Sequence, residues 1–258
     1  ISVQRDISER KKIEKTLRDA KDAAESSDKL KGEFLAQLSH EIRTPLNALI
    51  NSASLIQDEV KDVISEDTNV LFDSVTTSAK RIIRTVHMIL NMSELQTNTY
   101  EYIPKYIELN EKVEKLISEY QSVIEEKGLQ IVKNNNLENS NIFGDEYSIE
   151  QILVQLIDNA VKFTDSGIID ITIDKNKFNE LQIKIKDTGI GISELYQENL
   201  YQPFSQEEQG YKRKYDGNGL GLALVKKYCE LNNAEINCIS SKGLGTEFII
   251  TFNNSKVF

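Results

Sequence analysis

The feature that most constrains this chain is an unbroken helical pattern over residues 8–57, where charged residues are dense and Pro45 is the first proline. Apolar side chains recur there at three- and four-residue steps. The spacing over residues 13–24 is that of a coiled-coil seam, and residues 34–56 continue it as one apolar stripe. Because Pro45 removes a backbone donor, we expect one long helix that bends at this position.

A second helical pattern follows a polar stretch over residues 57–69. Periodic apolar residues resume at Val70 and continue to about Leu95. Two amphipathic helices joined by a short link predict a helical hairpin. A hairpin alone cannot bury both apolar stripes well, whereas two copies would close a four-helix bundle. We therefore expect a homodimer formed through this all-α hairpin.

The pattern changes after residues 96–104, which we interpret as a linker between domains. Helical and alternating segments then follow one another. This succession predicts a multidomain protein whose second domain is an α+β sandwich, with one sheet covered on one face by helices. The expected helices are 109–127, 148–163 and 220–231, and the expected strands are 129–133, 168–174, 181–186, 235–240 and 246–252.

Composition argues against two classes of protein. The chain has 31 Lys and Arg against 41 Asp and Glu, a net charge of −10, and no basic stripe, so we expect no direct binding of nucleic acid. No apolar run approaches the ~20 residues of a membrane span, and no signal peptide is recognisable. Cys229 and Cys238 form no metal or redox motif, which predicts reduced core cysteines in a cytoplasmic setting.

His40 is the first candidate for chemistry. It lies about 200° from Leu38 and from Ile42 on a helical wheel, so we expect it to face water. An exposed neutral imidazole is a nucleophile near pH 7, and the carboxylate of Glu41 can accept or orient its proton. A lone His-Glu pair is more often an incidental surface pair. His87 has no acidic neighbour, and we interpret it as structural.

A second candidate group lies on the expected helix 148–163. Gln155, Asn159 and Lys162 follow at i, i+4 and i+7, so they share one helix face. An amide oxygen is a suitable ligand for Mg²⁺, which keeps waters and binds phosphate oxygens. A lysine one turn on can meet the phosphates. The alternative is the polar outer face of an amphipathic helix.

Two glycine-containing segments complete the candidates. An expected strand ends at Asp187, and Gly189 and Gly191 then allow the backbone to approach a ligand closely. A buried aspartate there can accept the adenine amino proton, although a plain turn is an alternative. Residues 217–221 carry glycine at every second position before a helix, which can present backbone donors to phosphates. Their spacing is that of neither the dinucleotide motif nor the P-loop.

Together these segments resemble a known family. The run from Ser39 through His40, Glu41, Ile42, Arg43, Thr44 and Pro45 to Leu46 resembles the H box of sensor histidine kinases. In family order, residues 151–164 resemble the N box, 185–192 the G1 box, 201–205 the F box and 217–223 the G2 box. Residues 243–248 match the hairpin that closes the Bergerat-type ATPase fold, which type II topoisomerases, Hsp90 and MutL share.

The resemblance implies a role for each matching residue. His40 would be the phospho-acceptor, Glu41 its acid/base partner, and Thr44 the residue that helps to place water for dephosphorylation of the partner. Asn159 would hold Mg²⁺, Lys162 the phosphates and Asp187 the adenine. The remaining residues expected around ATP are Phe163, Gly189, Gly191, Gly217, Gly219, Leu220, Gly221 and Thr246.

The sequence departs from the family pattern at two positions. Gln155 replaces the usual Asn, which keeps an amide for the metal, and the usual Arg is absent near Ser148. Residues 206–216 would form a lid over the nucleotide. Arg213 and Lys214 in this lid would reach the γ-phosphate, or would simply lie in a solvated loop.

The implied activity is ATP-dependent autophosphorylation of His40 and transfer to an aspartate of a response regulator, with phosphatase activity toward that regulator. Two alternatives stay open: an ATP-driven clamp like Hsp90 or MutL, and a non-catalytic dimerising scaffold. Residues 3–11 resemble the exit of a PAS sensor domain, residues 1–5 have the character of a strand end without an initiator Met, and Ser8 is a suitable N-cap.

We therefore expect three parts, cut from a longer protein that is either soluble or anchored to a membrane. These parts are 1–30, the end of a sensor domain with a coiled-coil signalling helix; 31–97, the dimerisation and phosphotransfer domain; and 104–256, the ATP-binding domain.

Overall fold

The computed structural model describes residues 2–60, 63, 65–207 and 217–253; in its first helix the side chains of residues 2–13 and of several residues up to His40 lie outside this description. The chain divides into two compact units, 1–100 and 101–258. Each is considered by itself. None of the described helices is long and apolar enough to cross a lipid bilayer.

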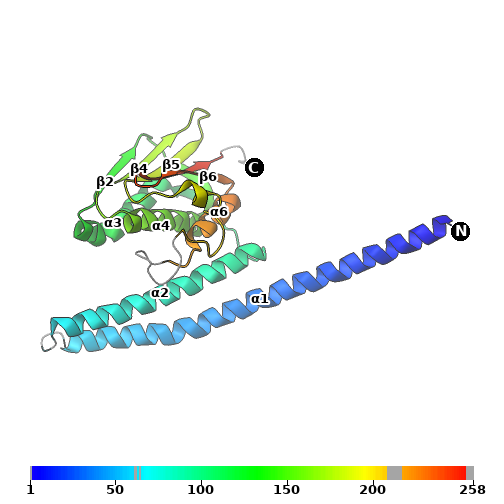
Figure 1. Cartoon of the computed structure of the whole chain (residues 1–258), viewed down its shortest axis with the longest axis horizontal. Helices are drawn as coiled ribbons and strands as arrows, with labels where there is room; N and C mark the ends of the chain where they lie inside the picture. Colours follow the sequence, from blue (N-terminus) through cyan, green and yellow to red (C-terminus); the bar gives the residue numbers. More distant parts are fainter. Residues whose placement is uncertain (1, 61–62, 64, 208–216, 254–258) are drawn as a thin grey trace. The chain divides into compact units, whose positions relative to one another are not determined.

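The first unit is the expected hairpin of two helices, α1 (Ser2–Val60) and α2 (Glu66–Gln96). Near the link, Gln57 Nε2 donates to Asn69 Oδ1 at 2.6 Å. At the other end of α2, a Cβ added to Gly32 would lie 3.9 Å from Thr97 Oγ1. The two helices therefore run antiparallel along each other, and α1 continues through Pro45 with a curved axis (Figure 1).

Two expectations about helix starts are wrong. The first helix already begins at Ser2, so residues 2–5 do not end a strand and Ser8 lies inside the helix rather than at its N-cap. The second helix begins at Glu66 rather than at Val70, because Ser65 Oγ accepts a hydrogen bond from Thr68 N at 3.3 Å and caps it. In both cases polar residues extend a helix that the apolar pattern alone leaves shorter.

The hairpin leaves much of its apolar stripe uncovered. Among its described side chains, only Ala79, Met88 and Met92 are buried apolar residues. Leu71 and Val75, in contrast, expose 65% and 54% of their surface. Monomeric soluble proteins rarely leave a contiguous apolar surface of this kind open to water.

The second unit is a sandwich of one five-stranded sheet and a layer of helices (Figure 1). The sheet has the order β2-β4-β5-β7-β6, in which β2 and β4 are parallel and the other neighbours antiparallel. Three longer helices cover one face of the sheet, which confirms the expected α+β sandwich. The strands are β2 (Gln130–Asn135), β4 (Ile168–Lys175), β5 (Leu181–Asp187), β6 (Ala234–Ser241) and β7 (Gly245–Phe252), and the helices are α3 (Leu109–Lys127), α4 (Glu146–Phe163) and α6 (Gly221–Leu231).

Three short elements were not expected. Strands β1 (Pro104–Glu108) and β3 (Asn141–Asp145) form a separate antiparallel pair, and α5 (Glu194–Gln197) is a single turn. Each is too short to give a readable period of apolar residues: β1 and β3 have five residues each and bury one large apolar side chain each, Ile107 and Ile142, and α5 has four residues and buries none. The expected strand at 129–133 also starts and ends later than predicted, because residue 129 still belongs to the turn that ends α3.

Local signals place the helices of this unit. Gly128 ends α3 in the left-handed conformation, with φ 63°, and its N–H donates to Ile124 O and Glu125 O. Asp145 caps α4 by accepting from Ser148 N at 2.8 Å. Lys112 in the first turn of α3 forms an ion pair with Glu146 at the start of α4, and Lys127 at the end of α3 donates to Val161 O near the end of α4, so the two helices run in the same direction.

The core lies between the sheet and the helices. Strand β5 shows strict alternation, so that Leu181, Ile183, Ile185 and Asp187 all point into the interior. Large apolar side chains fill the layer, and they are almost completely buried. Those contributed by β4 are Ile169, Ile171 and Ile173, and those contributed by the helices include Leu153, Leu156, Ile157, Leu224 and Val225.

A buried polar cluster joins α4 to α6. Asn232, which is 7% exposed, accepts from Asp145 N at 2.8 Å. Its amide nitrogen donates to Ser148 Oγ at 2.7 Å and to Tyr228 O at 2.8 Å. Ser148 thus has a defined structural role at the position near which the family pattern has Arg. One side chain links the first turn of α4 to the last turn of α6.

We predict that Asn232→Ala lowers the free energy of unfolding of the protein by about 2–3 kcal/mol, because it leaves buried donors and acceptors without partners. Urea denaturation followed by circular dichroism measures this loss. Asn237→Ala, on the exposed side of β6, is the control and should change the stability by less than about 0.5 kcal/mol. Equal losses in the two variants would contradict the assignment.

Candidate active site

Asp187 lies where β5 ends, at the edge of the core. It is 6% exposed, and its Oδ1 accepts from Gly189 N at 2.8 Å and from Thr246 N at 3.3 Å. Burial raises the pKa of this carboxyl, and the two backbone bonds lower it by a smaller amount. Among the described residues both hydrogen bonds go to Oδ1, so Oδ2 can accept a proton donor from a ligand.

The backbone around Asp187 is packed too closely for side chains. Gly245 has φ 92°, and a Cβ there would overlap Asp187 O. A Cβ on Gly191, which has φ 62°, would overlap Ser241 O. The two glycines therefore let the loop after β5 and the turn before β7 meet. A Cβ on Gly189 would likewise overlap Phe163 O, at the end of α4.

The face of α4 that was singled out from its spacing points to this end of the unit. Gln155 is 5% exposed, and a Cβ on Gly221 would lie 2.8 Å from its Oε1. Gln155 is therefore packed under the start of α6. Asn159, one turn further on, is half-buried. Among the described residues its side-chain amide has no hydrogen-bond partner.

Lys162 brings the N-box helix and the G2 segment together. Its Nζ lies 4.5 Å from the centre of the Phe163 ring. A Cβ on Gly217 would be 3.1 Å from the same Nζ. Residues 55 positions apart in the sequence, 162 and 217, thus meet at one side of the site.

The G2 segment ends at the start of α6. Gly219 has φ 71°, and its carbonyl accepts from Phe204 N at 2.9 Å. Leu220 N donates to Asn218 Oδ1 at 3.1 Å. Leu220 is the N-cap residue of α6 and makes no side-chain cap bond. The first turn of α6 can therefore offer backbone N–H groups, and the positive end of its dipole, to an anion.

Ser240 is a residue of this site that the sequence did not point out. Its Oγ accepts from Ile192 N at 2.8 Å and donates to Gly245 O at 2.8 Å. It also lies 3.0 Å from Thr246 Oγ1. Ser240 therefore ties the loop after Asp187 to the β6–β7 turn. The sequence predicted that Ser240 lies on a strand, but not which groups its side chain would hydrogen-bond.

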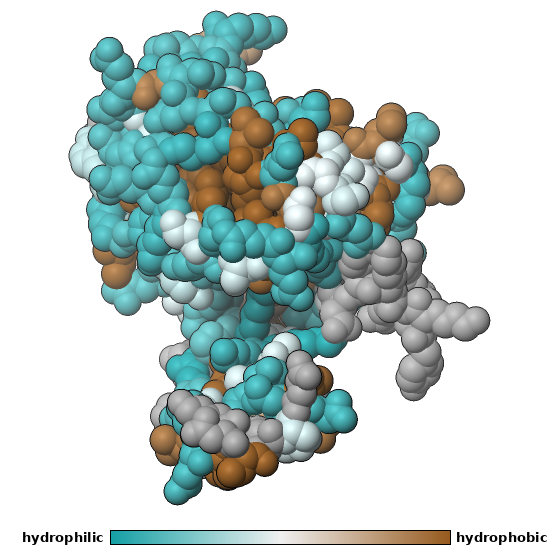
Figure 2. Space-filling view, turned by 90° about the vertical axis from the view of Figure 1, so that its left-hand side faces the viewer, coloured by the Kyte–Doolittle hydropathy of each residue, from teal (hydrophilic) through white to brown (hydrophobic). Residues whose placement is uncertain are grey.

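Figure 2 views the protein from the left-hand side of Figure 1, the side on which β7 begins. Hydrophobic surface gathers there in a hollow on the second unit, and hydrophilic residues surround it. Thr246 at the start of β7 pairs with Asp187 at the end of β5. Asp187 and Thr246 thus lie opposite one another on neighbouring strands.

The helical unit carries the other candidates. Glu41 and Thr44 are exposed on α1. His40 belongs to α1, but its side chain lies outside the described residues, as do Arg213 and Lys214. His87 is half-buried on α2, where burial and then the charge of Arg43 lower its pKa. A half-buried imidazole whose pKa is lowered fits the structural interpretation of His87.

Comparison with known families assigns both units. Residues 30–98 match the His Kinase A (phospho-acceptor) domain. Residues 144–256 match the family of histidine kinase-, DNA gyrase B- and HSP90-like ATPases. The first match contains the H box, and the second contains the segments that form the site around Asp187.

Individual relatives show the same arrangement. The autoinducer 2 sensor kinase/phosphatase LuxQ of Vibrio parahaemolyticus is 33% identical over 238 residues, which are 90% of this chain and 27% of LuxQ. The signal transduction histidine-protein kinase BarA of Escherichia coli is 30% identical over 91% of this chain and 26% of its own length. The chain thus spans about a quarter of these two relatives.

A solved structure agrees with these matches. Full-length ShkA, crystallised in complex with AMPPNP, is similar with a TM-score of 0.69 and 25% identity, over 85% of this chain and 45% of ShkA. A phospho-acceptor hairpin followed by an ATPase sandwich is therefore common to all of them. The chain belongs to the sensor histidine kinase family.

Proposed function

We propose that this chain binds ATP and Mg²⁺ in its second unit and phosphorylates its own His40. The phosphoryl group would then pass to an aspartate on the receiver domain of a response regulator. The observation that carries the proposal is the meeting of Asp187, Lys162 and the start of α6 at one end of the sandwich. ShkA, crystallised with an ATP analogue, and LuxQ, named a sensor kinase/phosphatase, support it.

Asp187 would select adenine. Its carboxylate accepts a hydrogen bond, so the exocyclic amino group of adenine is a suitable partner, whereas the carbonyl of guanine is not. Gly189 N and Thr246 N fix the orientation of the carboxylate through Oδ1. A buried acceptor left without a partner costs free energy, which disfavours the wrong base.

The phosphates would lie toward Lys162 and the first turn of α6. Asn159 Oδ1 is a hard oxygen ligand and fits Mg²⁺, which is held by few protein ligands together with substrate phosphates. Gln155 would support the metal site from beneath Gly221 rather than bind the metal in the open. A bound Mg²⁺ would neutralise charge on the phosphates during transfer.

At the acceptor, an imidazole nitrogen of His40 would attack the γ-phosphorus in line with the departing ADP oxygen. Glu41 would take or orient the proton of the ring. The protein supplies mostly position and charge neutralisation in such a transfer. Arg213 and Lys214 would add positive charge near the γ-phosphate. Thr44, exposed one turn after His40, would help to place water when the regulator is dephosphorylated.

The organisation proposed for the chain has three parts: 1–30, the signalling helix that leaves a PAS-like sensor domain; 31–97, the dimerisation and phosphotransfer domain; and 104–256, the ATP-binding domain. Two hairpins would pair through the uncovered apolar stripe, because a four-helix bundle buries what one hairpin exposes. Partners of the chain would be a second copy of itself and a response regulator.

The dimer proposal predicts an effect of charge on the stripe. Val75→Glu should shift the protein from dimer to monomer in sedimentation equilibrium, because it would place a carboxylate in the core of the bundle. Thr77→Glu, which lies about 200° away on the same helix, should leave the dimer intact. A Val75→Glu protein that remains dimeric would refute this interface.

The kinase proposal predicts a single labelled residue. Incubation with γ-labelled ATP should give acid-labile label in the parent protein and in His87→Asn, but none in His40→Ala. His87 is the matched control, because the chain has only two histidines. Equal label in His40→Ala and the parent would reject autophosphorylation at His40. ATP hydrolysis without label in any variant would favour the clamp alternative.

The adenine proposal predicts a pH dependence. Because burial raises the pKa of Asp187, the charged form exists above that raised pKa and is lost as the pH falls through it. Affinity for ADP should therefore fall at a higher pH than an exposed aspartate would give. Asp187→Asn should bind about 10- to 100-fold more weakly.

Calorimetric titrations between pH 7 and pH 5 measure both proteins side by side. Protonation of the nucleotide itself is common to them, so the ratio of the two affinities isolates Asp187. This ratio should shrink as the pH falls. A constant ratio over the whole range would show that the carboxylate does not titrate there or does not contact the base.

A further inference from the structure

The end of α4 is held by a side chain from another helix. The last carbonyls of a helix have no partner within it. Lys127 Nζ donates to Val161 O at 2.7 Å, and to Lys162 O and Thr164 O at 3.3 Å each. Phe163 O, between them, accepts from Ile190 N at 3.2 Å. Four consecutive carbonyls therefore have partners outside α4.

The ammonium group of Lys127 and the carbonyl groups that it contacts are complementary in hydrogen bonding and in charge. A lysine ammonium has three donors and no acceptor, and it meets three carbonyl oxygens. Its positive charge lies at the C-terminal end of α4, where the helix dipole is negative. Lys127 is the last residue of α3, and the left-handed turn at Gly128 then leads the chain away to β2. The ammonium is consequently fixed from a helix end, not from a loop.

The residues held in this way border the nucleotide site. Lys162 offers its carbonyl to Lys127 while its side chain lies over Phe163 and beside Gly217. Phe163 O in turn packs against Gly189 in the loop after Asp187. The last turn of α4 is thus clamped between α3 and that loop.

We propose that Lys127 is a positioning residue for nucleotide binding. It does not touch the nucleotide. It sets the last turn of α4, so that Asn159 and Lys162 keep their places relative to Asp187 and the start of α6. This inference rests on the proposed binding of ATP. It adds a side chain 35 residues before Lys162 in the sequence to the machinery of that site.

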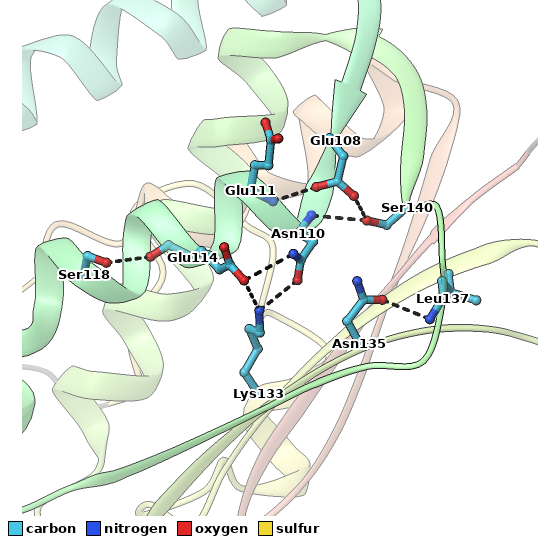
Figure 3. A network of polar contacts seen from close by, with 9 residues as sticks. All are labelled: Glu108, Asn110, Glu111, Glu114, Ser118, Lys133, Asn135, Leu137 and Ser140. Carbon is cyan, nitrogen blue, oxygen red and sulfur yellow. Dashed lines mark hydrogen bonds and ion pairs between the residues drawn. The ribbon is translucent and has the colours of Figure 1, made fainter.

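Lys133 offers a matched control at the other end of α3. It lies on β2 and forms an ion pair with Glu114 and a 2.9 Å hydrogen bond to Asn110 Oδ1. Figure 3 shows both contacts, within a network that also joins Glu108 to Ser140. Like Lys127, Lys133 ties α3 to its surroundings, but among the described residues it makes no hydrogen bond or ion pair with α4.

The test compares Lys127→Met, Lys127→Gln, Lys127→Arg and Lys133→Met in the whole chain. Titration calorimetry with AMPPNP and Mg²⁺ gives Kd, and thermal melting of the same samples gives stability. Lys127→Met should raise Kd about tenfold, the range known for residues that support binding groups. Lys127→Gln keeps two N–H donors and should therefore lose less affinity for AMPPNP. It also provides a second measurement if the Met variant folds poorly. Lys127→Arg should restore most of the affinity.

The control decides between positioning and general stability. Lys133→Met should lower the melting temperature and leave Kd unchanged. An equal rise of Kd in Lys133→Met would overturn the inference, and so would an unchanged Kd in both Lys127→Met and Lys127→Gln. In those cases the parent still binds AMPPNP, and the proposed function stands. A parent that fails to bind AMPPNP would overturn the proposed function and this inference together.

Discussion

The alternation of strand β5 is the constraint on which the second unit depends. Side chains of a strand alternate between its faces, so the period that buries Leu181, Ile183 and Ile185 also delivers Asp187 to the interior face. A carboxylate in an apolar layer must be hydrogen-bonded. Gly189 N and Thr246 N meet this need, and the close approach of their loops requires glycine at positions 191 and 245.

Near Asp187, one helix, α4, meets the start of another, α6. The second half of α4 lies against the start of α6 and the segment before it, through Gln155 beneath Gly221 and Lys162 beside Gly217. The carbonyls of α4 are taken up by Lys127 and Ile190. The first turn of α6 has no side-chain cap. Backbone acceptors are thus satisfied inside the protein, while backbone donors remain for an anion.

Sequence reasoning identified the parts that depend on local pattern. The hairpin and the three helices of the sandwich follow from periodicity, whereas Asp187 was singled out as the carboxylate that ends a strand before two glycines. The predicted helix boundaries were wrong where a polar cap such as Ser65 sets the start of the helix. Strands β1 and β3 were missed because a five-residue strand with a single large apolar side chain in the core, Ile107 or Ile142, gives no readable period of apolar residues.

Contacts between segments far apart in the sequence could not be predicted from the periodicity of apolar residues. The parallel pairing of β2 with β4 and the partners of Ser240 and Lys127 join residues far apart in the sequence. For the candidate site, residue type and motif order were sufficient to name Asn159, Lys162 and Asp187. They did not reveal that Gln155 is buried beneath Gly221, since that depends on how two helices pack.

The burial of the two cysteines has a chemical consequence for this site. Burial raises the pKa of Cys229 to about 12 and, with a further contribution from Asp187, that of Cys238 to about 12. Only the thiolate reacts readily with oxidants and electrophiles, so the raised pKa values disfavour such reactions at neutral pH. Cys238, on whose thiol the charge of Asp187 acts, therefore gives the candidate site little sensitivity to redox conditions. Thiol-directed reagents should leave both cysteines largely unmodified in the folded protein.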